Sequence, residues 1–199
     1  MDLISDYDLF FLLEIRDADS SSFYEVCEAL SGYECYLSER NGRSISKEAV
    51  GVFVRSSLDD SKLNDYIVDS VTLENSSFER LPVYFDVLDT RYLAVHLNPD
   101  DVYREMEALD GIASGYDGRV VALGDMNADC DYYSSGVDFY EWNWVIGDDE
   151  DTASGFKDCA YDRIIVSSGV SVINSGVVEI DPLVSDHNLV WVEIGRDTA

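Results

Sequence analysis

Runs of apolar residues alternate with short polar segments along the chain, and this pattern predicts both strands and helices. Apolar side chains recur at helical spacing over 23–30, so we expect a helix there, with Asp19 or Ser20 as its N-cap. A second helix is expected to start at Pro99, because proline is favoured at the first helical position. Strands are predicted where apolar runs are bounded by turn residues: 9–15, 33–37, 50–54, 66–73, 81–88, 92–96, 119–123, 161–166, 170–173 and 189–193.

The order of these elements predicts a layered α/β domain with mixed sheets, because strands outnumber helices and the helices fall between strands. The stretch 125–157 is rich in Gly, Ser and Asp, and we expect it to be irregular except for a short aromatic helix around Phe139–Trp144. No internal repeat or linker divides the sequence. A chain of 199 residues therefore predicts a single domain, 1–199, with a sizeable core.

The chain is strongly acidic, with 41 Asp plus Glu against 13 Lys plus Arg and a net charge of −28. An apolar content of 46% argues against a disordered acidic chain. Dispersed acids and few lysines predict a solvated acidic surface and a salt-adapted, halophilic protein, since the Debye length falls to about 3 Å in molar salt. Taken alone, this charge disfavours nucleic acid as a partner in ordinary buffer.

No apolar run is long enough to span a membrane, and the first residues lack the basic and cleavage segments of a signal peptide. We therefore expect a cytoplasmic protein, or an extracellular one if a signal peptide lies upstream. The cysteines do not follow a zinc-site pattern. Two disulfides are compatible with the four cysteines, but the residues alone leave the pairing open.

The candidate chemical groups lie at the ends of predicted strands, where a rigid backbone can hold a side chain in a cleft. Gly124–Cys130 follows one apolar strand, and Ser185–His187 precedes another. The two histidines of the chain, His96 and His187, both lie beside acids at strand edges. Because histidine titrates near neutral pH, this placement predicts acid–base chemistry rather than a purely structural role.

Oxygen donors at the same strand ends predict a site for a hard divalent ion. Asp125 and Asn127 alternate across one turn, so both can reach one ion. Together with Glu14 and Asp186 they favour Mg²⁺, Mn²⁺ or Ca²⁺ over zinc. The alternative for Glu14 is a solvated strand terminus. Metal-binding oxygens combined with an acid–base histidine predict metal-assisted phosphoester cleavage.

These motifs resemble the deoxyribonuclease I branch of the endonuclease/exonuclease/phosphatase superfamily, in family order from about residue 7 to about residue 194. Gly-Asp-x-Asn and Ser-Asp-His are typical of the superfamily, and Cys-Ala-Tyr-Asp-Arg-Ile is more specific to deoxyribonuclease I-like enzymes. The matching pieces are 7–17, Gly42-Arg43, Lys47-Glu48, 78–82, His96 with Pro99, 124–130, 159–166 and 185–187. The resemblance implies a four-layer α-β-β-α sandwich with two packed mixed sheets. It also implies a monomeric, divalent-metal-dependent endonuclease that hydrolyses DNA phosphodiester bonds.

The resemblance also implies a role for each matching residue. Glu48 would orient His96, and Asp162 would orient His187, so that one imidazole activates water and the other protonates the leaving oxygen. Glu14 would bind the ion. The residues implied to position metal and phosphate are Asp125, Asn127 and Asp186; those implied to contact substrate are Arg16, Arg43, Arg80, Tyr132 and Tyr161; and Cys130 would pair with Cys159.

Two departures from the family pattern change the expectation. The family's first strand and its Asn have no counterpart, so we expect the chain to be N-terminally incomplete; a mis-assigned start or a shortened homologue are the alternatives. Ser46 stands near the position of a tyrosine that grips DNA beside Arg43, so DNA contact should be weaker or less sequence-sensitive. Two other functions stay open: a catalytically inactive homologue that acts as an interaction protein, and a phosphodiesterase or phosphatase with another substrate.

Overall fold

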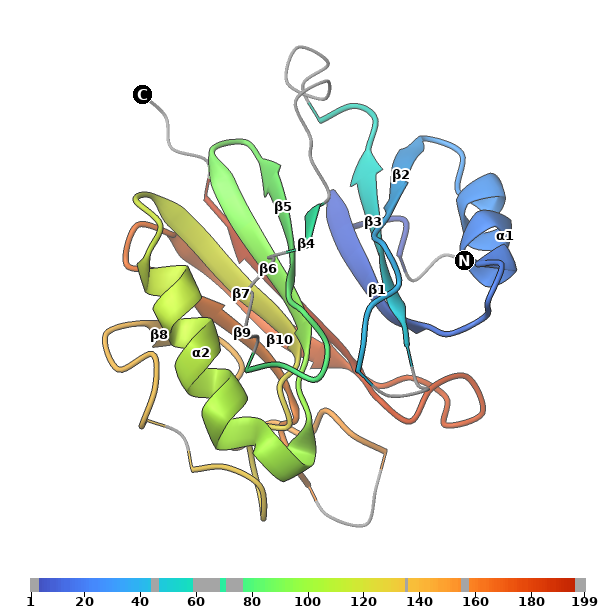
Figure 1. Ribbon diagram of the computed structural model, residues 1–199. Helices are drawn as coiled ribbons and strands as arrows, with labels where there is room; N and C mark the ends of the chain where they lie inside the picture. Colours follow the sequence, from blue (N-terminus) through green and yellow to red (C-terminus); the bar gives the residue numbers. More distant parts are fainter. Residues whose placement is uncertain are drawn as a thin grey trace.

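A computed structural model describes residues 4–43, 47–58, 69–70, 77–134, 136–154 and 158–195 (Figure 1). Strands dominate the described chain, and the two α-helices lie far apart in the sequence. The helical elements are α1 (Ser21–Ala29), the 3-10 turn η2 (Pro99–Asp101) and α2 (Val102–Ser114). The strands are β1 (Leu9–Ile15), β2 (Tyr33–Leu37), β3 (Ala49–Arg55), β4 (Asp69–Ser70), β5 (Val83–Val87), β6 (Thr90–His96), β7 (Arg119–Asp125), β8 (Asn143–Trp144), β9 (Asp162–Val166), β10 (Val172–Val178) and β11 (Leu189–Ile194).

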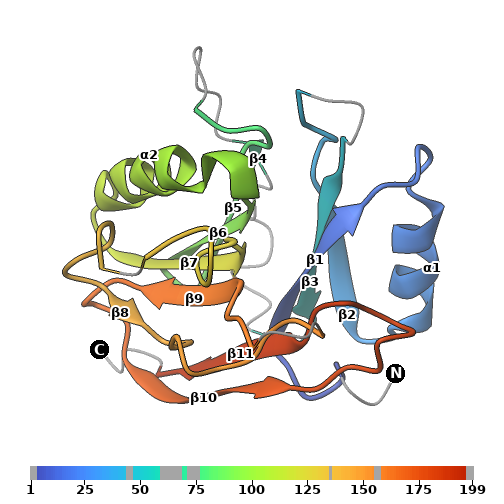
Figure 2. The same ribbon diagram turned by 90° about the horizontal axis from the view of Figure 1, so that it is seen from below.

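The elements stack in four layers, with α1 and α2 on opposite sides of the molecule (Figure 2). A six-stranded sheet of order β4-β5-β6-β7-β9-β8 has α2 packed on one face. Its other face meets the sheet β1-β3-β2 and the sheet β10-β11. Helix α1 packs on the outer face of β1-β3-β2. The predicted four-layer α-β-β-α sandwich is thus confirmed.

Strand direction differs between the two β layers. The six-stranded sheet is mixed, because β6 and β7 run parallel whereas its other neighbouring strands are antiparallel. In the described residues the second layer consists of two separate antiparallel sheets rather than one mixed sheet. Parallel pairing of β6 and β7 brings their carboxyl ends to one edge of the sheet, since α2 crosses back between them.

Two clusters of apolar side chains pack between the β layers. Val52 and Val54 of β3 pack against Phe85 of β5, and all three side chains are fully buried. On the other side, Val121 and Ile164 pack against Val190 of β11. Burial of such side chains contributes about 1.5–3 kcal/mol each, so packing between the β layers stabilises the fold substantially.

The predicted helix around Phe139–Trp144 is wrong. Turns occupy 136–142, and β8 begins at Asn143. Phe139 has a φ of 53°, a left-handed conformation that a right-handed helix cannot contain. Its ring is instead buried against the α2 cluster, and its backbone N–H donates to Asp110 Oδ2 at 2.9 Å. Tertiary packing of the aromatic ring therefore overrides the local pattern.

The start of α1 is capped differently from the simple expectation. Ser20 occupies the N-cap position with a φ of 54° and makes no side-chain cap bond. Asp19 Oδ1 accepts from the N–H of Ser21, and Asp17 Oδ2 accepts from the N–H of Ser22. Asp17 thus fixes the segment between β1 and α1 to the helix, which matters for the site below.

The strand expected at 66–73 lies outside the described residues apart from β4, and Ser46 lies outside them altogether. None of the described helices is long and apolar enough to cross a membrane.

Candidate active site

Strands β6 and β7 present His96 and Asp125 side by side, because these two residues are register partners at the ends of the parallel pair. Gly124 makes this close approach feasible. Its φ is 126°, and a Cβ at this position would lie 2.1 Å from the carbonyl oxygen of Val95. A side chain there would push β7 away from β6, so glycine is required for the placement of Asp125.

The next strand adds a third functional side chain. Asp162 begins β9 and pairs with Asp125 in the antiparallel ladder. His187 lies in the loop before β11, where an isolated bridge to Ala153 holds its backbone. Three neighbouring strands and one anchored loop therefore bring together both histidines and two of the predicted aspartates.

His96 is held by a carboxylate from the opposite β layer. Its Nδ1 lies 2.8 Å from Oε1 of Glu48, which directly precedes β3. Arg80 Nε lies 3.3 Å from the same Glu48 oxygen and also donates to the backbone oxygen of His96 at 3.0 Å. The His96 side chain is only 11% exposed. The imidazole is therefore fixed in orientation and leaves its Nε2 directed away from Glu48.

His187 is held by Asp162 through a contact of the same kind. The distance between His187 Nδ1 and Asp162 Oδ2 is 2.7 Å. The hydrogen bond to Asp162 raises the pKa of His187 to about 9, with further raising from the charges of Asp162, Asp125 and Asp186. At 32% exposure this imidazole is more open to solvent than His96. It is thus protonated at neutral pH in the metal-free protein.

Asp125 lies between the two imidazoles. Its Oδ2 is 3.5 Å from His96 Nε2 and 3.8 Å from His187 Nε2. Burial is the largest cause that raises the pKa of Asp125 to about 6, and the Asp162 carboxylate raises it further. Both histidines therefore point their second ring nitrogen toward one small region of space, where a reacting group can be contacted from two sides.

Glu14 reaches this region because β1 is irregular at its end. The register shifts between Leu12, opposite Gly51, and Ile15, opposite Ala49. Glu14 has a φ of 58° within this bulge. Its Oε1 lies 3.4 Å from His96 Nδ1, and its side chain is 45% exposed. Bulges commonly redirect a side chain next to an active site, and Glu14 follows that pattern.

The residues present fit a hard divalent ion. Ligand atoms of Glu14, Glu48 and His96 lie within 4.8 Å of one another. Glu48 Oε2 is buried and accepts no hydrogen bond from the described residues, and its ion pair with Arg16 is long at 3.9 Å. An orphaned carboxylate oxygen beside an exposed carboxylate is a donor set that suits Mg²⁺, Mn²⁺ or Ca²⁺.

The other predicted ligands lie close by in the described structure. Asn127 follows Asp125 with a φ of 48°, and its N–H donates to Asp125 Oδ1 at 3.0 Å. Its side-chain nitrogen donates to the backbone oxygen of Leu97 at 2.9 Å. Asp186 adjoins His187 and raises its pKa electrostatically. Asn127 thus lies beside Asp125, Asp186 beside His187 and Glu14 beside His96, and binding of one ion by these oxygens stays a prediction.

Comparison with protein families matches residues 1–187 to the Endonuclease/Exonuclease/phosphatase family. The chain belongs to this family. Deoxyribonuclease-1 of Bos taurus is 28% identical over 206 aligned residues, which cover 88% of this chain and 71% of the relative. Deoxyribonuclease gamma of Mus musculus is 27% identical, with 88% of this chain and 65% of the relative covered.

Solved structures of the endonuclease/exonuclease/phosphatase family share the fold. A family member from Beutenbergia cavernae matches with a TM-score of 0.67 at 18% identity, covering 96% of this chain and 64% of its own. The mannosyl-6-phosphatase Bt3783 of Bacteroides thetaiotaomicron matches with a TM-score of 0.61 at 17% identity, covering 96% and 86%. The layered sandwich described above is therefore the fold of the family.

Two arginine side chains lie beside the carboxylates next to His96. Arg80 contacts Glu48, as described, and Arg16 Nη2 lies 2.7 Å from Glu14 Oε1 with 56% of its side chain exposed. The backbone N–H of Arg43 donates to the carbonyl of Glu79 at 3.1 Å, which places Arg43 beside the Arg80 loop. The Arg16 and Arg80 side chains thus lie beside Glu14 and Glu48, and the backbone of Arg43 lies next to the Arg80 loop.

The predicted tyrosines and cysteines lie next to the Asp125–Asn127 turn, where the N–H of Met126 donates to the carbonyl oxygen of Tyr161 at 2.9 Å. The rings of Tyr132 and Tyr161 are 5.8 Å apart, and Tyr132 is exposed. The Cys130–Cys159 disulfide is present, so that pairing is confirmed. A second disulfide joins Cys27 of α1 to Cys35 of β2, which the residues alone did not establish.

Sequence reasoning missed Thr152 and Glu105. Thr152 is fully buried, and its Oγ1 accepts from the N–H of Asp162 at 2.9 Å. Its carbonyl accepts from the N–H of Asn188 at 2.8 Å, so it ties Asp162 to the His187 loop. Glu105 is buried on α2 and accepts from the N–H groups of Glu79 and Asn98 at 2.6 and 2.7 Å. Neither residue stands in a motif, although Glu105 interrupts the apolar face of the predicted helix.

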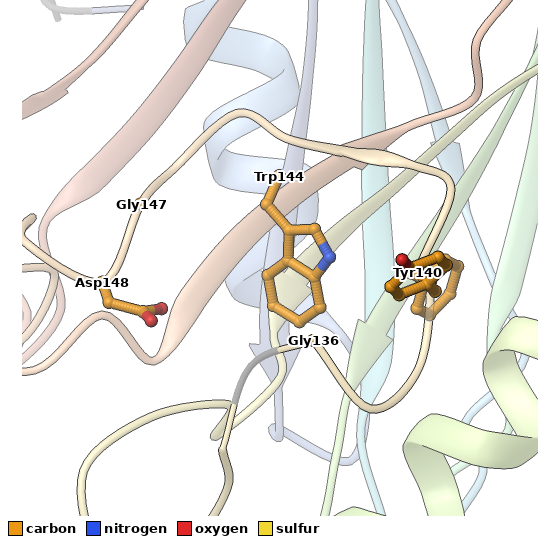
Figure 3. Close-up of a pocket in the computed structure, with 6 residues that line it drawn as sticks. Gly136, Tyr140, Trp144, Gly147 and Asp148 are labelled. Carbon is orange, nitrogen blue, oxygen red and sulfur yellow. The ribbon is translucent and has the colours of Figure 1, made fainter.

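A cavity of about 370 Å³ lies on the α2 side of the six-stranded sheet, and the histidine pairs do not line it. Figure 3 shows the Trp144 indole between Tyr140 and Asp148. The cavity is lined by Gly136, Phe139, Tyr140, Trp144, Gly147 and Asp148. No predicted site residue lines it. The candidate active site is therefore identified by its histidine pairs rather than by the shape of this cavity.

Proposed function

We propose that this protein is a divalent-metal-dependent endonuclease that hydrolyses DNA phosphodiester bonds. The observation that carries the proposal is the convergence of two carboxylate-bound imidazoles on one position beside Asp125. Relatives named deoxyribonuclease support DNA as the substrate. Membership of the endonuclease/exonuclease/phosphatase family supports the coarser activity, hydrolysis of phosphodiester bonds with a divalent ion.

The two imidazoles have different protonation tasks. Because His187 is protonated at neutral pH, it suits the role of general acid that gives a proton to the leaving oxygen. His96 then takes a proton from the attacking water through Nε2, while Glu48 stabilises the ring on the Nδ1 side. Asp162 likewise stabilises the His187 ring on its Nδ1 side.

Glu14, Asp125, Asn127 and Asp186 would hold the divalent ion and position the phosphate. When bound, Mg²⁺, Mn²⁺ or Ca²⁺ supplies positive charge that stabilises the phosphate oxygens as negative charge builds up. Glu14 is exposed at a bulge and can turn toward an ion without losing buried packing. Asp125 is buried, so its carboxylate lies in surroundings of low dielectric, where its attraction for a cation is stronger.

The substrate backbone would contact Arg16, Arg43 and Arg80, because a polyanion needs cationic partners. Tyr132 and Tyr161, whose rings lie together, would add a further substrate contact. Two disulfides are typical of proteins in oxidising compartments, which supports an extracellular location for this enzyme.

A net charge of −28 requires conditions that weaken repulsion from DNA. Ordinary basic DNA-binding proteins lose affinity as salt rises, through counterion release. We predict the opposite for this chain, because screening relieves both internal repulsion and protein–DNA repulsion. Circular dichroism and plasmid nicking, followed together from dilute buffer to molar NaCl at fixed divalent ion, separate folding from cleavage. A protein that is fully folded and fastest in dilute buffer would contradict salt adaptation.

The activity is tested on supercoiled plasmid with Mg²⁺, Mn²⁺ or Ca²⁺, in salt at which the protein is folded, with a chelator as the control. A sugar 6-phosphate is the comparison substrate, because one structural neighbour is a mannosyl-6-phosphatase. We expect metal-dependent nicking and little release of inorganic phosphate. Efficient phosphate release without nicking would favour a phosphatase. A folded protein inactive on both substrates would favour an interaction protein.

A further inference from the structure

Arg40 joins two segments next to the site: one follows β1 and carries Arg16, and the other precedes β3 and carries Glu48. Its Nη1 donates to the carbonyl oxygen of Arg16 at 2.8 Å and also to that of Asp17. Its Nη2 donates to the carbonyl oxygen of Lys47 at 2.7 Å. One planar guanidinium thus connects the segment after β1 with the segment before β3, a geometry that a lysine ammonium does not reproduce.

The segment that carries Arg16 is held from two directions. Arg40 binds its carbonyls, while the Asp17 carboxylate accepts hydrogen bonds from Ser21 and Ser22 at the start of α1. The Arg16 side chain itself is 56% exposed and contacts Glu14. Its backbone is therefore fixed while its guanidinium faces solvent beside the histidine pairs.

Glu48 is held independently of Arg40. Asn41 and Glu48 exchange two backbone hydrogen bonds, at 2.9 and 3.1 Å. The Glu48 carboxylate also contacts His96 and Arg80 from within the core. Loss of the Arg40 guanidinium should therefore release the Arg16 segment much more than the His96–Glu48 pair.

We propose that Arg40 is a positioning residue that holds Arg16 in place for the DNA backbone, and so favours polymeric DNA over small phosphodiesters. This inference rests on the proposed function. A cationic contact fixed before binding avoids the entropy cost of ordering its loop in the complex. The effect should be larger on DNA than on a small diester, because the Arg16 guanidinium is exposed and a polymer offers it phosphates beyond the one that is cleaved.

The test compares Arg40→Ala with the wild type on DNA and on bis(p-nitrophenyl) phosphate. We expect the KM for DNA to rise about tenfold, equivalent to about 1.4 kcal/mol, with kcat changed much less and the small diester little affected. Arg55→Ala is the matched control. Arg55 likewise binds backbone carbonyls, of Ser5 and Tyr7, but at the opposite end of β3. It should lower stability without raising the KM for DNA.

A double-mutant cycle shows whether Arg40 acts through Arg16. In an Arg16→Ala background, Arg40→Ala should add less than about a twofold change in KM. Arg40→Lys covers the case in which Arg40→Ala fails to fold, and should raise the KM by a smaller factor. Hydrogen–deuterium exchange of residues 14–18 should quicken in the Arg40 variants and stay unchanged in Arg55→Ala. Unchanged KM and exchange, or additive losses with Arg16→Ala, would overturn the inference. A folded wild-type protein that cleaves neither substrate would instead overturn the proposed function and this inference with it.

Discussion

The two histidine pairs use the same contact in different surroundings. His96 is nearly buried, and its partner Glu48 comes from the other β layer, so this pair depends on how the sheets pack. His187 is three times as exposed, at 32% against 11%, and its partner Asp162 lies on the adjacent strand of the site. Arg80 adds a positive charge beside Glu48, whereas three aspartates act on His187. One fold thus produces a nearly buried imidazole whose partner carboxylate contacts an arginine and a more open imidazole that is protonated at neutral pH.

Removal of either imidazole should cause the largest loss of activity, because both are proposed to act in the same reaction. We expect His96→Ala and His187→Ala each to lower plasmid nicking by about 10²–10⁴-fold, the usual contribution of a general acid or base. Circular dichroism at the assay salt concentration serves as the folding control. A variant that is folded and nicks at a near-normal rate would remove that histidine from the mechanism.

Loss of either carboxylate partner should lower the nicking rate, and only loss of Asp162 should change the pKa of His187. Asp162→Asn and Glu48→Gln should each lower nicking by about 10–100-fold, as is typical for carboxylates that support an imidazole. Asp162→Asn should also lower the pKa of His187 from about 9, because Asp162 is the largest cause of its elevation.

NMR titration of the metal-free protein can follow this change, since the chain contains two histidines. Because the folded-state pKa of His187 is raised, the Asp162 contact stabilises the fold fully below pH 6.5 and loses this contribution as pH rises through about 9. The variant should show a weaker loss of stability over that range. An unchanged His187 pKa in Asp162→Asn would contradict the assigned cause.

Glu14 belongs to the His96 side of the site, so its loss should affect metal binding there. Glu14→Gln removes one negative charge and should weaken divalent-ion binding by about tenfold, or about 1.4 kcal/mol. Isothermal titration calorimetry measures this affinity directly. Asp19→Asn is a matched control, since Asp19 lies nearby in sequence and contacts the start of α1 instead. Equal affinities in Glu14→Gln and the wild type, or full activity in excess chelator, would refute the metal assignment.

Removal of a disulfide should change the cleavage rate least. It should lower the free energy of unfolding by more for the longer loop than for the shorter one. Cys130–Cys159 spans 29 residues on the His187 side, and Cys27–Cys35 spans 8 residues beside β1-β3-β2. Loop-closure entropy gives stabilisations of about 3–4 and about 2–3 kcal/mol respectively. Paired Cys→Ser variants compared by urea unfolding should keep this order. Peptide mapping that finds four free thiols in native protein would contradict both disulfides.

The sequence predicted the parts of the site that lie on regular strands. The bounds of β1 and β2 agree with the hydrophobic pattern, and His96 and Asp125 were placed because each ends an apolar run. The pairing of Cys130 with Cys159 and the two histidine–carboxylate pairs came from motif resemblance, which carries long-range information that periodicity lacks.

Other features depend on contacts that no local pattern encodes. Thr152 and Glu105 act through hydrogen bonds to distant backbone groups, so the only local sign was that Glu105 interrupts the apolar face of its helix. The left-handed Phe139 arises because its ring packs against α2, and the bulge at Glu14 arises from the pairing of β1 with β3. Arg40 occupies an ordinary polar loop, and only the fold brings three carbonyl oxygens around it.

The central claim is that both imidazoles act on the same phosphate, and the double variant His96→Ala/His187→Ala tests it most directly. Plasmid nicking by the wild type, both single variants and the double variant is measured at one divalent-ion and salt concentration. Groups that serve one step lose their effects non-additively, so the double variant should be only slightly slower than the slower single variant. Losses that multiply across the two sites, or a folded wild-type protein that does not nick DNA, would contradict the account.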